Sequence, residues 1–275
     1  MVFHPCGREW LGPGTDKTVY GRPERGYDAP HVGRGKARQA TFYKTHAKDW
    51  HHALQGDPVR SGRHPLDTLE DLATAANRAL GTLGLPAHPT DAYRVFVGDG
   101  LRTLAERILP GEQRSAAQVD ALVAAFEREY SRTWNERTAP YAGVPEMLDR
   151  LTGDGYRMSV LSNKPDAFTR LCVEQLLPHW TFAPLYGQRP GVPKKPDPAA
   201  ALAIAAELGL DPAEVLYLGD TATDMHTARA AGMAAVGVLW GFRSADELRA
   251  AGARHLITHP GELAPLLHPS SAPRS

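Results

Sequence analysis

From Pro140 onward, short apolar runs that suit β-strands alternate with segments of helical periodicity. This alternation indicates a doubly wound, Rossmann-like α/β core, in which helices cover both faces of a parallel sheet. Ligands of such sheets bind at the carboxyl ends of the strands. The expected strands are residues 157–161, 182–186, 215–219, 234–239 and 255–257, and the expected helices are residues 145–152, 165–176, 197–208, 222–231, 244–251 and 261–267.

Polar residues follow two of these expected strands directly. Ser162 and Asp220 each come after the last apolar residue of a strand, so we expect both side chains to project into one crevice. The hydroxyl of Ser162 can donate to a phosphate oxygen, and Asn163 can contribute its amide or its backbone N–H. An ordinary turn with a helix N-cap explains a Ser-Asn pair equally well when the pair stands alone. Here two further motifs accompany it.

Lys195 and Asp224 belong to those further motifs. Lys195 precedes Pro196, which favours extended backbone at a helix entrance, and its ammonium can neutralise phosphate charge. Asp220 and Asp224 lie close to the start of a helix and supply the hard oxygen ligands that suit Mg²⁺. The alternatives are a solvated lysine, and an Asp220 that caps the helix while Asp224 complements the helix dipole.

The sequence therefore predicts a phosphate site with Mg²⁺ as its cofactor. Ser162, Lys195 and Asp220 are the candidate catalytic residues. Ser162, Asn163 and Lys195 are the candidate phosphate ligands, and Asp220 and Asp224 are the candidate metal ligands. Two other residues, Arg94 and His226, are interpreted as solvated side chains on helices. The alternatives are that Arg94 meets a substrate carboxylate and that His226 ligates the metal, for which oxygen ligands are better suited.

Upstream of this region the pattern is helical throughout. Leucine and alanine recur at helical spacing over residues 65–84, and Asp67 with Glu70 forms a capping-box pattern. A second apolar stripe runs from Ser115 to about Arg137. The expected division is an all-helical domain at residues 65–140, the α/β core at residues 141–268 and a tail at residues 269–275.

Residues 1–64 have a different composition. They contain no Ile, two Leu and four Val, set among Gly, Pro, Arg and His without helical or strand periodicity. Such a segment buries too little apolar surface to order itself. We therefore expect an N-terminal segment without ordered structure.

The motifs together resemble the haloacid dehalogenase superfamily of phosphatases, over about residues 65–267. The helical part is most similar to phosphoglycolate phosphatases. The resemblance is carried by Leu161–Pro165, Lys195–Pro198 and Leu216–Gly241 in the core and by Asp67–Asn77 and Tyr93–Gly100 in the helical domain.

This resemblance implies a small helical cap on the doubly wound core, Mg²⁺, and an aspartyl-phosphate intermediate. It implies that Ser162 binds phosphate, that Lys195 stabilises the phosphate charge, and that Asp220 ligates the metal with support from Asp224. Such phosphatases open with a strand that ends in Asp-x-Asp-Gly-Thr and supplies the nucleophile. In this chain no carboxylate lies between Pro58 and Leu66.

We hypothesise that a frameshift removed the missing motif. If Val59 to Pro65 is encoded GTT CGA TCT GGA CGG CAC CCN, reading from one nucleotide later gives TTC GAT CTG GAC GGC ACC, which encodes Phe-Asp-Leu-Asp-Gly-Thr. The same shift between His52 and Pro58 permits a start codon and a hydrophobic strand. Residues 1–64 are then either disordered or an out-of-frame segment.

The expected function is hydrolysis of a small phosphate monoester, 2-phosphoglycolate, although the chain as written lacks the nucleophile and is expected to be inactive. The alternatives are a non-catalytic protein that binds phosphate compounds, and another small-molecule phosphatase, a pyrophosphatase or a mutase of the same superfamily. A dehalogenase is disfavoured, because such enzymes do not need the carboxylate pair. A disordered arm that recruits a partner is a further alternative for the N-terminal segment.

Composition limits the partners. The chain has 31 basic and 31 acidic residues, so there is no net field to gather nucleic acid or an anionic membrane. The expected partner is a small phosphorylated metabolite. Cys6 and Cys172 are far apart and form no CxxC motif, which fits a reducing cytosol. With neither a signal-peptide pattern nor a long apolar stretch, the expected location is the cytoplasm.

Overall fold

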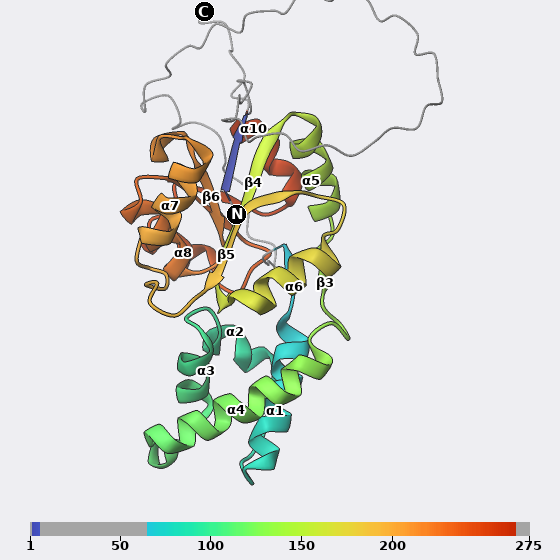
Figure 1. Cartoon of the computed structure of the whole chain (residues 1–275), viewed down its shortest axis with the longest axis vertical. Helices are drawn as coiled ribbons and strands as arrows, with labels where there is room; N and C mark the ends of the chain where they lie inside the picture. Colours follow the sequence, from blue (N-terminus) through green and yellow to red (C-terminus); the bar gives the residue numbers. More distant parts are fainter. Residues whose placement is uncertain (1, 6–64, 268–275) are drawn as a thin grey trace, which may run out of the picture. The chain divides into compact units, whose positions relative to one another are not determined.

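The computed structural model describes residues 2–5 and 65–267. In this part of the chain, six strands form one sheet in the order β5-β4-β1-β6-β7-β8 (Figure 1). The pairs β4–β5, β6–β7 and β7–β8 are parallel, as predicted. The strands are β1 (Val2–Pro5), β4 (Tyr156–Pro165), β5 (Phe182–Gln188), β6 (Leu216–Gly219), β7 (Ala234–Val238) and β8 (His255–Ile257).

The strand in the middle of this sheet differs from the prediction. β1 runs antiparallel to both neighbours, with Val2 opposite Ser159 of β4 and Tyr217 of β6. The expectation of an N-terminal segment without ordered structure is therefore wrong for Val2–Pro5, and the sheet is mixed. Backbone N–H and C=O groups on the facing edges of β4 and β6 need partners, and a short strand supplies them whatever its side chains. The rest of residues 1–64 and the tail lie outside the described residues.

The pairing with β1 ends before the carboxyl ends of its neighbours. It covers Tyr156–Ser159 on β4 and Leu216–Tyr217 on β6. Beyond these ranges, no strand of the described residues pairs with those two edges. The middle of the sheet is therefore incomplete next to Ser162 and Asp220, at the end where ligands of such sheets bind.

Helices cover both faces of the sheet, as the alternating pattern predicts. Successive residues of β6 show this, because Tyr217 belongs to one hydrophobic cluster and Leu218 to the other. The Tyr217 face packs against α7 (Ala199–Leu208), α8 (Ala222–Ala230) and α9 (Ala245–Ala250), and the Leu218 face against α5 (Val144–Gly153), α6 (Asp166–Leu176) and α10 (Leu263–Leu267).

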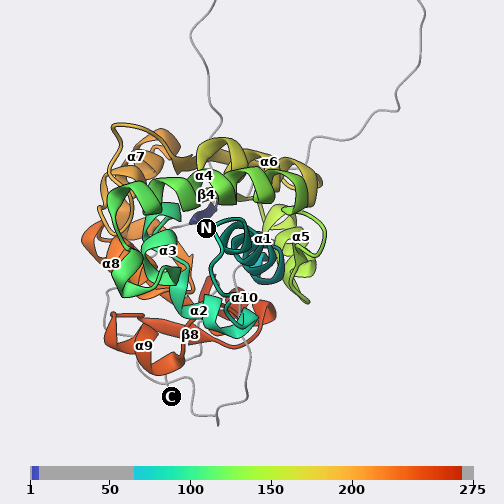
Figure 2. The ribbon, with the colours of Figure 1, turned by 90° about the horizontal axis from the view of Figure 1, so that it is seen from below.

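A second group of helices precedes the core and lies together (Figures 1 and 2). Two short strands, β2 (Leu66–Asp67) and β3 (Ala139–Pro140), pair antiparallel where the chain enters and leaves this group. The helices are α1 (Leu69–Thr82), α2 (Tyr93–Phe96), α3 (Leu101–Ile108) and α4 (Ala116–Thr133). The described residues also form short 3₁₀ helices: η1 (Thr90–Ala92), η2 (Gly111–Gln113), η3 (Pro212–Glu214) and η4 (Pro260–Glu262).

The start of α1 corrects the predicted helix of residues 65–84. Leu66 and Asp67 are paired with β3, so the helix begins later, with Thr68 as its N-cap and no side-chain cap. The expected capping box is wrong, because Asp67 accepts a bond from Leu69 N (3.3 Å) and Glu70 pairs with Arg137 (3.3 Å). Cross-strand pairing competes here with the local capping pattern.

The end of α4 is set by a long-range contact. The prediction placed the end of this helix near Arg137, but α4 stops at Thr133. Buried Asp71 of α1 accepts bonds from the backbone N–H groups of Arg137 (3.0 Å) and Thr138 (2.8 Å). The carboxylate therefore takes donors that a longer helix would use within itself.

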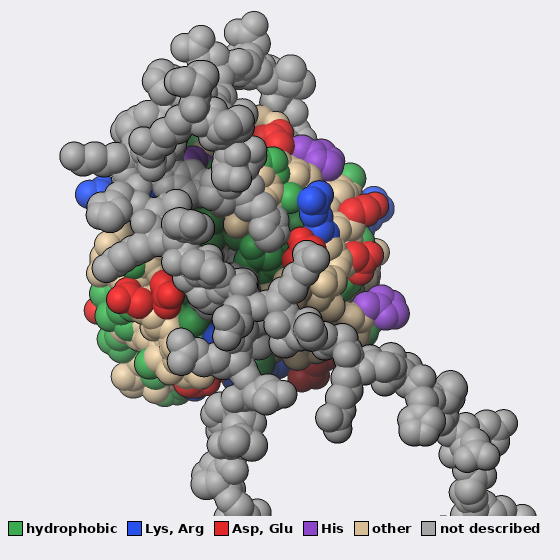
Figure 3. All heavy atoms as spheres, turned by 90° about the horizontal axis from the view of Figure 1, so that it is seen from above, with side chains coloured by type: hydrophobic (Ala, Val, Ile, Leu, Met, Phe, Trp, Pro, Cys, Tyr) green, Lys and Arg blue, Asp and Glu red, His purple; other side chains and the backbone are tan. Residues whose placement is uncertain are grey.

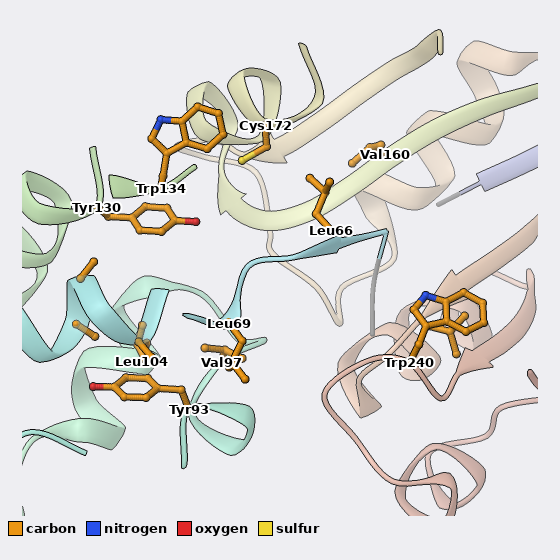
Figure 4. Packing of buried hydrophobic residues seen from close by; sticks show 14 of the residues in the cluster. Leu66, Leu69, Tyr93, Val97, Leu104, Tyr130, Trp134, Val160, Cys172 and Trp240 are labelled. Carbon is orange, nitrogen blue, oxygen red and sulfur yellow. The ribbon is translucent and has the colours of Figure 1, made fainter. Parts of the chain in front are cut away.

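One hydrophobic cluster extends from the helices α1–α4 to a face of the sheet (Figure 4). It contains Leu69 and Tyr130 from the helical group, Leu66 from β2, and Val160 and Cys172 from the core. In Figures 1 and 2, α4 lies beside α6, and the rings of Tyr130 and Phe168 are 5.4 Å apart. The helical group is thus packed onto the core through apolar contacts.

The described surface agrees with the balanced composition. In Figure 3, acidic and basic side chains lie interspersed on the visible described residues. Across the described part of the chain, no helix combines the length and the apolar character that crossing a membrane requires.

Candidate functional site

The five residues predicted from the motifs meet at one pocket of about 200 Å³. Ser162 and Asn163 come from β4, Lys195 from the loop before α7, and Asp220 and Asp224 from the junction of β6 and α8. The wall opposite these polar groups is mostly apolar and includes Leu72, Leu101, Leu104 and Phe126 of the helical group and Phe168 of α6.

Asp224 is the centre of the buried network. Its Oδ1 accepts bonds from Lys195 Nζ (2.6 Å) and from the Tyr217 hydroxyl (3.3 Å). Its Oδ2 accepts bonds from the Thr221 hydroxyl (2.6 Å) and from the backbone N–H groups of Thr221 and Asp220 (3.2 and 3.3 Å). Both oxygens of Asp224 are therefore occupied by the protein itself.

Asp220 follows β6 directly, as predicted, but it is not the helix cap. Thr221 is the N-cap of α8, and its hydroxyl accepts from Asp224 N (3.2 Å). Asp220 Oδ2 accepts from Phe242 N (2.9 Å), and no described residue hydrogen-bonds its Oδ1. Burial, and next the carboxylate of Asp224, raise the pKa of Asp220 to about 7.

Lys195 is almost fully buried, with 9% of its side chain exposed. Burial alone favours the neutral amine, but the Asp224 carboxylate, with Tyr217 and Asp220, raises the pKa of Lys195 above its ordinary value. Its ammonium also donates to Leu161 O (3.3 Å). The solvated lysine considered as an alternative is therefore wrong for Lys195.

Asn163 holds the Lys195 loop in place. Its Oδ1 accepts from Lys195 N (2.9 Å), and its Nδ2 donates to Lys195 O (3.2 Å) and to Gly98 O (3.3 Å). The amide that was predicted to help bind phosphate is therefore occupied by backbone groups.

Ser162 was expected just after a strand, but β4 continues to Pro165, which pairs with Gln188 of β5. Ser162 is half-buried, and its Oγ accepts from Lys164 N (3.1 Å). The hydroxyl proton of Ser162 remains available to a ligand in the pocket.

Two glycines make room for the carboxylates. A Cβ at Gly241 would lie 1.8 Å from the Cβ of Asp220, and one at Gly219 would lie 2.2 Å from the Cβ of Asp224. Real Cβ atoms do not approach so closely. Any larger residue at these positions must therefore displace the acidic side chain.

A loop of the helical group lies against the same site. The Thr223 hydroxyl donates to the Asp99 carboxylate (2.6 Å), and Lys194 Nζ donates to Asp99 O (2.7 Å). Arg243 donates to Val97 O (3.0 Å). Hydrogen bonds from Thr223 and Arg107 lower the pKa of Asp99 in spite of its partial burial, which acts in the opposite direction. The loop is held by core residues that sequence reasoning did not identify.

The donor set can be compared with the needs of Mg²⁺. Asp220 offers one open carboxylate oxygen, whereas both oxygens of Asp224 are occupied. Within residues 2–5 and 65–267, no group of three or more His, Cys, Asp or Glu side chains is placed to hold a metal. Proteins hold Mg²⁺ through one or two carboxylates with phosphate oxygens and water, so Asp220 fits such an ion.

Lys164 and Tyr130 were not identified from the sequence as site residues, but both line the pocket. Lys164 stands two residues after Ser162, and this spacing on a strand was the available signal. Arg94 does not line the pocket; it is half-buried and pairs with Asp91 (3.3 Å), so it is less solvated than predicted. His226 is exposed, as predicted.

Known proteins with similar sequences include phosphoglycolate phosphatases. The phosphoglycolate phosphatase of Psychrobacter arcticus is 30% identical over 190 residues, which cover 67% of this chain and 83% of that protein. That of Nitrosospira multiformis is 34% identical over 188 residues, which cover 66% of this chain and 82% of that protein.

Similar solved structures and a family model indicate the same family as these relatives. The crystal structure of a phosphoglycolate phosphatase candidate from Lactobacillus delbrueckii superimposes with a TM-score of 0.70 at 25% identity, covering 76% of this chain and 95% of that chain. The model of the haloacid dehalogenase-like hydrolases matches residues 66–238, the stretch that carries every polar residue of the pocket. The chain belongs to the haloacid dehalogenase-like hydrolase family.

Proposed function

We propose that this site is that of a Mg²⁺-dependent phosphatase for a small phosphate monoester, 2-phosphoglycolate. The observation that carries the proposal is the meeting of Ser162, Lys195 and Asp220 at one pocket, at the carboxyl ends of β4 and β6, which lie on either side of β1. The names of the relatives, phosphoglycolate phosphatases, support the choice of substrate.

Each residue has a role that its contacts suggest. The Ser162 hydroxyl donates to a phosphate oxygen, and the Lys195 ammonium adds positive charge beneath the phosphate. Asp220 lines the pocket with one carboxylate oxygen open and would hold Mg²⁺, which neutralises phosphate charge when bound. Asp224 and Asn163 fix Lys195 and are positioning residues.

The helices α1–α4 act as the cap of this site in our proposal. Their apolar side chains form the pocket wall opposite the polar residues, and the Val97–Gly100 loop lies against Thr223 and Asn163. A closed cap excludes bulk water from the reacting phosphate, which strengthens the charge interactions inside the pocket.

The chain as written lacks one group that this chemistry needs. In the superfamily an aspartate attacks phosphorus, but no carboxylate lies between Pro58 and Leu66. Without that nucleophile no aspartyl-phosphate forms, so we expect ligand binding without turnover. This same observation favours the second candidate function, a protein that binds phosphate compounds without hydrolysing them.

Two measurements separate these possibilities. The nucleotide sequence of codons 50–68 shows whether the shifted frame encodes Phe-Asp-Leu-Asp-Gly-Thr. Phosphate release from 2-phosphoglycolate with Mg²⁺ is then compared between two proteins. One is the 275-residue chain, and the other begins near position 52, is read in the shifted frame up to position 65 and continues unchanged from Leu66. We expect release only from the second, with loss of release on Asp220→Asn. Robust release from the 275-residue chain would contradict the proposal that it lacks the nucleophile.

A further inference from the structure

Lys164 lies beside the phosphate end of the pocket. It stands two residues after Ser162 on β4, and both side chains line the pocket. Two residues of extended chain span at most about 7 Å, which bounds the Cα separation of the pair. The Lys164 N–H donates to Ser162 Oγ (3.1 Å), so the two residues are also linked directly.

Among the residues that the structure describes, the ammonium of Lys164 has no charged hydrogen-bond partner. Its Nζ donates to the Tyr130 hydroxyl (2.8 Å) and lies 4.0 Å from Cys172 Sγ and 5.0 Å from the centre of the Tyr130 ring. No carboxylate of the described residues lies within ion-pair distance. An ammonium has three donors, and these neutral contacts use at most two of them.

The carboxylate of Asp71, which acts on Lys164, already accepts hydrogen bonds from other residues. Asp71 of α1 acts on Lys164 electrostatically. Its oxygens, however, accept bonds from Arg137 N, from Thr138 N and from the Thr138 hydroxyl. A half-buried cation among apolar walls is unfavourable without a counter-ion, so an anion entering the pocket would be attracted strongly.

Tyr130 fixes the position of this cation. Its ring stacks on Phe126 (5.1 Å between centroids) and contacts Phe168 (5.4 Å). The Tyr130 hydroxyl is thus held by ring packing on both sides, and its bond with Lys164 joins α4 to β4. Lys164 is thus held by the helical group while it stands beside Ser162 of the core.

We propose that Lys164, positioned by Tyr130, binds the carboxylate at the non-transferred end of the substrate, while Ser162 contacts its phosphate. The inference rests on the proposed function and names the residues that select the substrate. One ammonium with a free donor suits a singly charged carboxylate, whereas a second phosphate needs more donors. A monoester with a neutral end leaves the cation unpaired and is therefore rejected.

The test is isothermal titration calorimetry of the 275-residue chain with Mg²⁺. The ligands are 2-phosphoglycolate and ethyl phosphate, which has similar length but no carboxylate. We expect 2-phosphoglycolate to bind about tenfold more tightly, the difference that one charge-assisted hydrogen bond provides. In Lys164→Met this preference is lost while the affinity for ethyl phosphate stays the same.

Two further variants control the result. Lys194→Met removes a neighbouring lysine that does not line the pocket, and it should keep the preference. Tyr130→Phe keeps the ring but removes the hydroxyl, and we expect it to reduce the preference about threefold, since part of the interaction persists. Thermal melts of each variant show whether it is folded. If Lys164→Met does not fold, the wild-type ligand pair and Tyr130→Phe decide the question.

The possible failures are distinguishable. If neither ligand binds to the wild-type chain, the proposed phosphate site is wrong and this inference falls with it. If both ligands bind with equal affinity, the phosphate site stands and the role of Lys164 is overturned. An unchanged preference in folded Lys164→Met overturns it as well.

Discussion

The two lysines of the pocket have opposite surroundings. Lys195 is buried and forms an ion pair with Asp224 at 2.6 Å, and both oxygens of that carboxylate accept hydrogen bonds from the protein. Lys164 has a tyrosine hydroxyl and a thiol beside it, and no acid of the described part of the chain forms an ion pair with it. A network that is complete within the protein maintains structure. A network with unused hydrogen-bond donors can still bind a ligand. This difference separates positioning residues from binding residues.

The largest test of this comparison replaces each lysine by methionine. Lys195→Met leaves Asp224 buried without its cation, next to a second acid, so it should lower the free energy of unfolding by about 3–5 kcal/mol. Lys164→Met removes an uncompensated charge and should change stability by less than about 1 kcal/mol. Urea unfolding of the ligand-free variants measures both values. If both variants lose the same free energy of unfolding, the two lysines do not differ in the way we describe.

Asp220 makes stability depend on pH. Its pKa rises from 3.8 to about 7 on folding, so the folded chain keeps a proton that the unfolded chain has released. The stabilisation is complete below about pH 4 and is lost as pH rises to about 7, with a change of a few kcal/mol at most. Urea unfolding with EDTA across this range should show the decrease. Asp220→Asn should make the free energy of unfolding less dependent on pH. If the pH dependence is unchanged in that variant, another group causes it.

Gly241 tests whether the open oxygen of Asp220 depends on close packing. A Cβ at this position would lie 1.8 Å from the Cβ of Asp220. We expect Gly241→Ala to lower the free energy of unfolding by about 1–3 kcal/mol and to weaken Mg²⁺ binding. The matched control is Gly81→Ala on α1, where no atom lies within 4 Å of an added Cβ. It should raise stability by about 0.5–1 kcal/mol, because alanine favours a helix.

The smallest test concerns the cap of α8. Thr221→Ala removes the hydroxyl that caps the helix and donates to Asp224. The expected loss is about 1–2 kcal/mol, because a cap bond and a bond within the buried network disappear together. Ser115→Ala removes the cap of α4, which is exposed, and should lower stability by about 0.5–1 kcal/mol. Chemical unfolding of both variants measures the difference, and a larger loss at Ser115 would show that the buried network adds nothing.

Much of the fold follows from local pattern. The strand His255–Ile257 has its predicted bounds, and the strand that precedes Asp220 ends at Gly219 as predicted. Apolar runs and helical periodicity are properties of neighbouring residues, so they can be read directly. The antiparallel strand β1 could not be predicted this way, since its partners in β4 and β6 are more than 150 residues away in the sequence and no local pattern shows that their backbone edges need pairing.

The site divides in the same way. The sequence by itself determined that Ser162, Lys195 and Asp220 stand in short motifs at strand and helix ends, and from these motifs we predict that they carry the chemistry. Only the tertiary structure decided which of their atoms are free. The bond from Phe242 to Asp220 joins residues 22 apart, and that from Lys164 to Tyr130 joins residues 34 apart. Hydrogen-bond partners so distant are brought together by packing of the helical group and the sheet, and no local pattern encodes that contact.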